Sequence, residues 1–360
     1  MALTIGAAGS PSQKTINFDA LLSTSLANHN KVLTNNISTS NVLFFLIKKR
    51  GNYRSVDGGV NIEIPLMHAL GTADTYDGYD ALSTDPMDGI TKALYEWSQM
   101  AVPITISRKE QRQNAQKIID LFETKIEQAD LGIQEFFSQM ILRGGKAGGG
   151  SGSVEAKYTS ALNNSSGVNP LGLLIKKDPT TTSVGHIDPS VSTWWQNQTD
   201  SSSASTSTAF LQEIESMYNS CSKGPGGPPD LLLTDQVTFE LIKFALYHRL
   251  RHELSNDAKF PFINVMYQGA KVVWDEFVPD IQNLTTTPNT GKGTIFFLNS
   301  KFWQVKYDSQ SNFINTEFQK PANQDGKVAH ILWMGQVCVN NRRKHGVMYN
   351  IARTLTLGDA

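Results

Sequence analysis

Residues 58–66 read GGVNIEIPL and residues 104–112 read ITISRKEQR, and these two runs indicate the fold of the chain. In the first run apolar side chains alternate with other residues, the pattern of a β-strand with one buried face. Pro65 lies within this run and favours an edge or irregular strand, because proline donates no backbone hydrogen bond. We expect the returning strand over residues 90–106, so that residues 51–106 form one long hairpin.

The connection of this hairpin, residues 71–89, reads GTADTYDGYDALSTDPMDG. It is too polar to bury and too long for a tight turn, and loops of this length are usually functional or disordered. Tyr76 and Tyr79 carry amphipathic rings suited to packing on another surface. Four aspartates could bind a hard cation, but their spacing departs from an EF-hand loop, so we expect no metal here. These residues are Asp74, Asp77, Asp80 and Asp85.

Residues 107–143 are predicted to form one uninterrupted amphipathic helix. Ser107 and Glu110 fit a capping box, with Ser107 as the N-cap and Glu110 reaching back to it. One apolar stripe follows, made of Ile118, Phe122, Ile126, Ala129, Ile133, Phe137 and Met140. Gly144 and Gly145 end a helix that is on the order of 50 Å long. A bundle or coiled-coil helix is the alternative, but no second helix of similar length is present to pair with it.

From residue 210 onward the chain has α/β character, after two polar stretches at 144–153 and 199–208. Residues 1–50 indicate an N-terminal arm with short amphipathic pieces, and residues 144–153 indicate a flexible loop. Thr234 is expected to cap a helix that follows a short buried strand. The predicted elements are a helix near 210–218, the strand 231–233, the helix after Thr234, and strands at 270–274, 294–298, 302–305, 328–339 and 346–351.

Composition excludes several classes of protein. A chain of 360 residues with 39% hydrophobic and 18% charged residues is an ordinary globular protein. Its net charge of -1 argues against a dedicated nucleic-acid binder. We expect no membrane segment, because the longest apolar run is far shorter than the roughly 20 residues that cross a bilayer, and no secretory signal. Cys221 and Cys338 are expected to be reduced and structural.

The search for catalytic chemistry gives little. His248 and His252 have the i, i+4 spacing of a zinc site, but the glutamate follows the second histidine, so the general-base position of HExxH is missing. The glycines around Lys292 do not form a phosphate-binding loop. A metal-dependent enzyme using the two histidines remains an alternative. The main expectation is a protein without enzymatic activity, cofactor or metal.

The order of these elements resembles the major capsid proteins of tailed bacteriophages, which have the Hong Kong 97-type fold. The resemblance covers nearly the whole chain and is carried by Gly58–Ile62, by Trp97–Arg112 and by Trp194–Asn197. It implies an α+β fold with an N-terminal arm at 1–50, an extended E-loop at 51–106 and a peripheral domain at 107–169 whose spine helix is 107–143. The axial domain would be 170–325, and residues 326–360 would return to the sheet of the peripheral domain.

The resemblance also implies a function. The chain would self-assemble into hexamers and pentamers of an icosahedral shell that encloses double-stranded DNA without sequence-specific binding, assembled in the cytoplasm of a host bacterium and found in the virion. Contacts between subunits are expected at Tyr76, Tyr79, Arg54, Arg108 and Glu110. Expected partners are a separate scaffolding protein, a portal protein and, optionally, a decoration protein.

Some capsids of this fold join neighbours by a bond between an E-loop lysine and an asparagine. No lysine occurs between Gly51 and Thr91, and Lys92 lies near the base of the hairpin. We therefore expect a shell held by noncovalent contacts. Encapsulins, which share the fold and enclose cargo enzymes in bacteria, are the alternative to a phage capsid.

Overall fold

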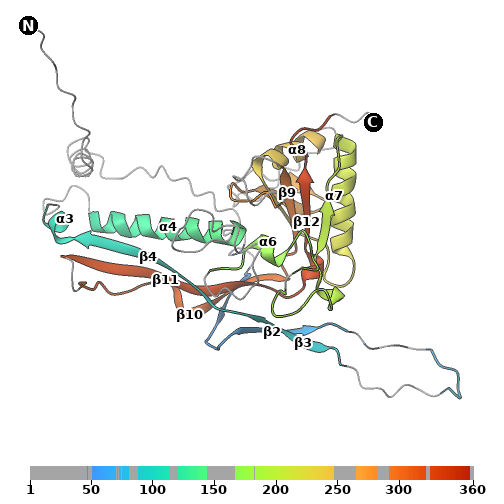
Figure 1. Ribbon diagram of the computed structural model, residues 1–360, viewed down its shortest axis with the longest axis horizontal. Coiled ribbons are helices and arrows are strands. Elements are labelled where there is room, and N and C mark those ends of the chain that lie inside the picture. Colours follow the sequence, from blue (N-terminus) through green and yellow to red (C-terminus); the bar gives the residue numbers. More distant parts are fainter. Residues whose placement is uncertain are drawn as a thin grey trace, which may run out of the picture.

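The part of the chain that the structure describes forms two β-sheets, a β-ribbon and the helices that cover them (Figure 1). The computed structural model describes residues 47, 51–69, 71, 73, 75–80, 88–113, 121–143, 167–181, 183–246, 265–281, 292–321 and 325–356. Its strands are β1 Tyr53–Val56, β2 Ile62–Met67, β3 Ile90–Tyr95, β4 Ser98–Ser107, β5 Gln198–Ser201, β6 Leu231–Thr234, β7 Val265–Tyr267, β8 Ala270–Trp274, β9 Gly293–Leu298, β10 Trp303–Asn315, β11 Gly326–Val339 and β12 Gly346–Ile351. Its helices are α3 Arg108–Gln113, α4 Leu121–Arg143, α6 Leu171–Leu174, α7 Ser207–Ser222, α8 Gln236–Leu246 and the 3-10 turns η2 Thr193–Trp195 and η3 Arg342–Lys344. The N-terminal arm lies outside the described residues apart from Ile47.

A four-stranded sheet of order β1-β10-β11-β4 forms the elongated part of the molecule. Its strands β4 and β11 pair antiparallel along their length, from Ser107 opposite Gly326 to Ser98 opposite Gly335. Helix α4 lies along this sheet (Figure 1). The predicted apolar stripe is confirmed where it is described, since Ala129, Ile133, Phe137 and Met140 are buried. The ring of Phe137 packs edge-on against Trp333, with centroids 4.8 Å apart.

The predicted helix 107–143 appears as α3 and α4. Residues 114–120 lie between them and outside the described residues, so its continuity stays a prediction. The capping box is confirmed in both directions. The backbone N–H of Glu110 donates to Ser107 Oγ at 3.2 Å, and the backbone N–H of Ser107 donates to Glu110 Oε2 at 3.1 Å.

The hairpin is shorter on its returning side than expected. Strands β2 and β3 pair from Ile62 opposite Tyr95 to Met67 opposite Ile90, in a ribbon of two strands, as Pro65 predicted. Residues 98–107 do not continue this ribbon, which corrects the expected return strand 90–106: they form β4 and pair with β11. The chain changes partner at residues 96–97, where the side-chain amide of Gln336 on β11 donates to the Glu96 carbonyl at 3.0 Å.

A second sheet of order β5-β12-β9-β6-β8-β7 carries α7 and α8 and forms the compact part of the molecule (Figure 1). The expectation that both final strands return to one sheet is wrong. Strand β11 belongs to the long sheet, whereas β12 pairs with β9 and β5 in this one. Gly346 permits the close approach of β12 to α7, because a Cβ there would lie 2.6 Å from Cys221 Sγ.

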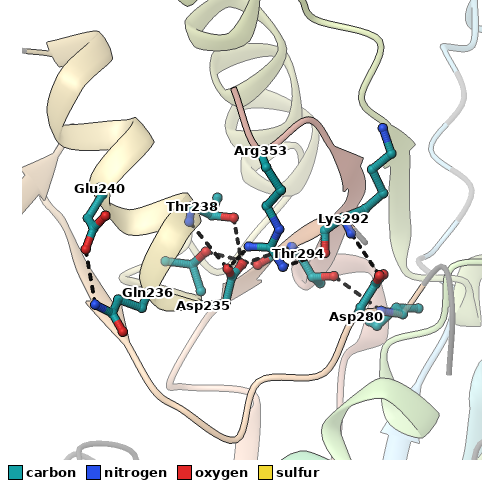
Figure 2. A network of polar contacts seen from close by, with 10 residues as sticks. Asp235, Gln236, Thr238, Glu240, Asp280, Lys292, Thr294 and Arg353 are labelled. Carbon is teal, nitrogen blue, oxygen red and sulfur yellow. Dashed lines mark hydrogen bonds and ion pairs between the residues drawn. The ribbon is translucent and has the colours of Figure 1, made fainter. Parts of the chain in front are cut away.

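The residue that caps α8 is Asp235, and not Thr234 as predicted (Figure 2). Asp235 Oδ2 accepts from the Thr238 backbone N–H at 3.4 Å, and Asp235 Oδ1 accepts from the Thr238 hydroxyl at 2.6 Å. Thr234 is the last residue of β6, and its hydroxyl donates to the carbonyl of Thr294 at 3.0 Å. Arg353, after β12, forms an ion pair with Asp235 and fixes the chain beyond the last strand to the start of α8.

The turn η3 joins the two sheets and begins with a buried cation. Arg342 is fully buried and donates to the carbonyls of Leu174 at 2.8 Å and Trp195 at 3.1 Å, and to Asn197 Oδ1 at 2.9 Å. Burial lowers the pKa of Arg342 to about 10, so the group stays protonated at neutral pH. Arg342, Lys344 and His345, which in sequence belong to a basic connection between strands, are buried, whereas Arg343 between them is exposed.

Candidate inter-subunit surfaces

The base of the hairpin is fixed to its own chain. Ile62, Ile64 and Leu66 face inward and are buried. On β3 the hydroxyl of Tyr95 donates to the Val339 carbonyl at 2.7 Å, and the backbone N–H of Leu94 donates to the Gly185 carbonyl at 3.0 Å. The direction in which the ribbon leaves the body is thus set by core contacts.

The outer face of the same ribbon has an exposed apolar end. Met67 and Ile90 are directly opposite each other and are 72% and 75% exposed. Next along the ribbon, Lys92 forms an ion pair with Glu63 at 3.1 Å, where both side chains are solvent-exposed. Because an exposed apolar cross-strand pair gains stability when another surface covers it, this end of the ribbon is a candidate contact surface. These two apolar residues were not among the contact residues expected from the sequence, although they lie on the same outer face of the ribbon as Pro65 and Lys92, two positions away.

The described part of the hairpin loop also presents aromatic rings to solvent. Tyr76 is 66% exposed and Tyr79 is fully exposed. The intervening turn is closed by Asp77 and Asp80: the backbone N–H of Asp80 donates to the Asp77 carbonyl at 2.8 Å, and the backbone N–H of Asp77 donates to Asp80 Oδ2 at 2.9 Å. The expectation that both rings are available for packing on another surface is consistent with this exposure, while their contact with a second subunit stays a prediction.

The other expected contact residues are not gathered at one place. Arg54 is exposed on β1, opposite Lys306 of the neighbouring strand β10. Arg108 and Glu110 lie in α3, which Figure 1 shows near the far end of the long sheet from the ribbon. The structure therefore separates Tyr76 and Tyr79 from Arg108 and Glu110.

Glu110 has its main interactions within its own chain. Besides the capping box, its Oε2 pairs with Lys125 Nζ at 3.0 Å. Burial alone would raise the pKa of Glu110, but the hydrogen bonds from Ser107 and Lys125 and the charge of Lys125 lower it below its usual value. This carboxylate stabilises the connection between β4, α3 and α4, and its contact with a second subunit stays a prediction.

Arg108 belongs to a basic cluster that was not predicted from the sequence. Its guanidinium lies 4.0 Å from Asp325, and Lys320 lies 3.9 Å from the same carboxylate. Lys109, Arg112 and Lys327 are exposed close by and line the same surface hollows. No local sequence pattern indicates this cluster, because strand pairing brings residues 108–112 and 320–327 together from distant parts of the sequence.

The candidate metal residues are only partly described. His248, His252, Asp74 and Asp85 lie outside the described residues. Among the residues that the structure does describe, no group of His, Cys, Asp and Glu could hold a metal ion. Cys221 and Cys338 are buried and unbonded, and burial raises the pKa of the Cys221 thiol to about 12. In the same described part, no helix is long and apolar enough to cross a membrane.

Comparison with solved structures relates this architecture to known proteins. The capsid asymmetric unit of cyanophage A-1(L) matches at 15% identity over 91% of this chain and 98% of that chain, with a TM-score of 0.66. The holo-SrpI encapsulin complex from Synechococcus elongatus PCC 7942 matches at 11% identity over 94% and 98%, with a TM-score of 0.56. The capsid of the native GTA particle matches at 9% identity over 92% and 99%, with a TM-score of 0.54.

A scan against protein-family models and a search of curated proteins gave no match. The solved structures nevertheless define the class of architecture, because the likeness extends over nearly the full length of both chains. The chain has the fold of these capsid and encapsulin proteins, and the resemblance to phage major capsid proteins is confirmed at the level of the fold.

Proposed function

We propose that this chain is the structural major capsid protein of a tailed bacteriophage. It self-assembles into hexamers and pentamers and forms the icosahedral shell around double-stranded DNA. The observation that carries the proposal is the likeness to the cyanophage A-1(L) capsid protein, with a TM-score of 0.66 over 91% of this chain. The protein acts as a structural subunit and not as an enzyme, and its place is the virion after assembly in the cytoplasm of the host.

The parts of the molecule suit separate tasks in such a shell. The ribbon β2–β3 and its loop serve as the E-loop, which lies across an adjacent copy. The surface of that copy covers Met67 and Ile90 of the ribbon. The long sheet with α4 serves as the peripheral domain and its spine helix. The second sheet with α7 and α8 serves as the axial domain. A ribbon of two strands needs such a partner surface, since two strands alone are at best marginally stable in water.

We propose further that the shell is held by noncovalent contacts. Lys92, the lysine nearest to the hairpin loop, is paired with Glu63 of the adjacent strand. A separate scaffolding protein and a portal protein assist assembly, and a decoration protein is an optional further partner. DNA inside the shell meets a protein with a net charge of -1, which fits contents that are bound without sequence specificity and later released.

Electron microscopy of the purified protein, expressed alone and together with its neighbouring genes, tests this proposal. We expect closed shells, or rings with five or six subunits. A compact monomer in both preparations would contradict the proposal and return attention to an enzyme that uses His248 and His252. Metal analysis of the same monomer would then test that alternative.

An encapsulin-type compartment is the second candidate, favoured by the TM-score of 0.56 to the holo-SrpI encapsulin complex. The two functions differ in what the shell contains. Particles purified from the native source and opened with denaturant should release double-stranded DNA if the chain is a capsid protein. Release of a cargo enzyme, encoded beside the shell gene, would support the encapsulin function instead.

A further inference from the structure

Basic side chains surround a pair of adjoining hollows where β4 passes into α3. One hollow, of about 190 Å³, is lined by Ile106, Arg108, Lys320, Asp325, Gly326 and Lys327. The other, shallower and of about 580 Å³, is lined by Arg108, Lys109, Arg112 and Asp325. We call this surface the basic hollow.

Positive charge in the basic hollow exceeds negative charge. Asp325 is the carboxylate that lines it, and this group is shared between Arg108 and Lys320 at 4.0 and 3.9 Å. Within the part of the chain that the structure describes, Lys109, Arg112 and Lys327 form no ion pair. A surface of this kind attracts an anionic group, and arginine in particular binds carboxylates through two parallel hydrogen bonds.

The hairpin has the opposite charge. Its loop, residues 69–89, contains no lysine or arginine, whereas its acidic residues are Asp74, Asp77, Asp80, Asp85 and Asp88, and at its base Lys92 is paired with Glu63. Asp77, Asp80 and Asp88 are exposed in the structure. Tyr76 and Tyr79 stand beside the first two, and their rings can accept the cations of lysine or arginine on their faces. The loop therefore presents both carboxylates and aromatic rings, and a basic surface can bind either of them.

The two surfaces cannot meet within one molecule. Figure 1, drawn with the longest axis horizontal, shows α3 toward one end of the molecule and the ribbon β2–β3 toward the other. The core contacts of Tyr95 and Leu94 hold the base of the ribbon in that direction. Contact between them therefore requires a second copy of the chain.

We infer that the acidic loop of the hairpin of one copy docks in the basic hollow of a second copy. The inference rests on the proposed function, and it specifies where the hairpin binds and by which force. The contact joins two different surfaces of identical chains, so it can be repeated from copy to copy and closes into rings or a shell when the rotation allows. Because solvent-exposed charges are screened over about 8 Å at physiological salt, assembly should weaken as salt is raised.

Charge reversal at each surface tests the inference. Asp77→Lys with Asp80→Lys reverses the loop, and Lys109→Glu with Arg112→Glu reverses the hollow. We expect either pair to lower the yield of particles at about 0.15 M salt at least tenfold, a factor that corresponds to about 1.4 kcal/mol. The four substitutions together should restore the yield to within about threefold of the wild type, because attraction returns with reversed sign.

Controls separate this contact from general effects of charge. Glu240→Lys and Lys223→Glu reverse exposed residues of the compact part of the molecule and should leave assembly unchanged. If the wild-type protein forms no particles, the proposed function itself fails. If the wild type assembles and the loop and hollow variants behave like the controls, the proposed function stands and the inference is overturned. A hollow reversal that only reduces co-purified nucleic acid would also overturn it and assign the hollow to DNA.

Engineered cysteines give a second, independent measurement that does not depend on the reversed variants folding. A chain with Asp80→Cys is mixed with a chain with Lys327→Cys under assembly conditions, and a mild oxidant is added. Cys221 and Cys338 are buried, so the new thiols are the ones that react. We expect a disulfide-linked dimer on a non-reducing gel. A matched mixture of Asp178→Cys with Lys327→Cys should give none, and equal dimer in both mixtures would contradict the inference.

Discussion

Arg342 shows how much one side chain contributes to this fold. Its guanidinium is buried at the junction of the two sheets and satisfies three acceptors from two segments, Leu174 in one and Trp195 and Asn197 in the other. Substitution Arg342→Ala leaves the buried carbonyls of Leu174 and Trp195 without this donor, whereas Asn197 Oδ1 keeps the Lys176 backbone N–H, and each buried acceptor without a donor costs about 1–3 kcal/mol. We expect the free energy of unfolding, measured by urea titration, to fall by roughly 3 kcal/mol or more.

The neighbouring Arg343 is a matched control because it has the same side chain but is exposed. Arg343→Ala should change the free energy of unfolding by no more than about 0.5 kcal/mol. Equal losses in the two variants would show that the basic turn acts through its charge and not through the buried hydrogen bonds.

His345, three residues after Arg342, makes stability depend on pH. Burial lowers its pKa to about 3, and its Nδ1 accepts from the Asn299 backbone N–H at 3.3 Å, so the folded protein holds the neutral imidazole. The unfolded chain binds a proton near pH 6.5. The stabilisation is therefore complete above pH 6.5 and is lost as the pH falls toward 3, by up to about 1.4 kcal/mol per pH unit.

Urea titrations of the wild type and of His345→Gln between pH 7.5 and 4.5 measure this contribution. We expect the wild type to lose stability more steeply than the variant below pH 6.5, because glutamine does not titrate. Parallel curves for the two proteins would contradict a neutral buried imidazole.

Among the elements, α4 rests on the long sheet mainly through its apolar stripe. Phe137 is fully buried and contacts Trp333 and Phe313 edge-on, with centroids at 4.8 and 6.2 Å. Phe137→Ala should lower the free energy of unfolding by about 3–5 kcal/mol, because it removes buried contacts and leaves a cavity. Glu127→Ala, at an exposed position of the same helix, is the control and should cost less than about 0.5 kcal/mol in the same titration.

The elements also show which parts of the fold can be predicted from sequence. The stripe of α4, the capping box and the strand with Pro65 depend on residues close together in the chain, and their spacing predicted them correctly. Strand partners depend on residues far apart, so neither the switch of residues 98–107 to β11 nor the pairing of β12 with β9 was predicted. Burial of Arg342 was missed for the same reason, since its acceptors lie some 150 residues earlier in the chain.

At the scale of the whole molecule, the absence of lysine from the sequence between Gly51 and Thr91 has a direct consequence for the proposed shell. A bond between an E-loop lysine and an asparagine cannot form without that amine. Purified particles boiled in detergent should give one band at the chain mass of 39.7 kDa. Ladders of covalent oligomers that survive boiling and reduction would contradict a noncovalent shell and would direct attention to Lys92.

The hairpin loop should matter for assembly and not for folding. Its described turn is stabilised from within, by Asp77 and Asp80, and the ribbon already closes at His68, whose backbone N–H donates to the Gly89 carbonyl at 2.8 Å. Replacing residues 69–88 by Asn-Gly should therefore yield a regular two-residue hairpin. We expect the free energy of unfolding of the subunit to change by no more than about 1 kcal/mol, since few buried contacts are lost.

The same variant should form no shells, as judged by electron microscopy and sedimentation, because the exposed carboxylates and tyrosines that would reach the next copy are gone. A second variant, with residues 69–88 replaced by a Gly-Ser loop of unchanged length, separates the chemistry of the loop from its reach. Loss of shells in both variants would show that the acidic and aromatic side chains are required. Shells of normal size from the shortened variant would mean that Met67, Ile90 and the two sheets hold neighbouring copies together by themselves.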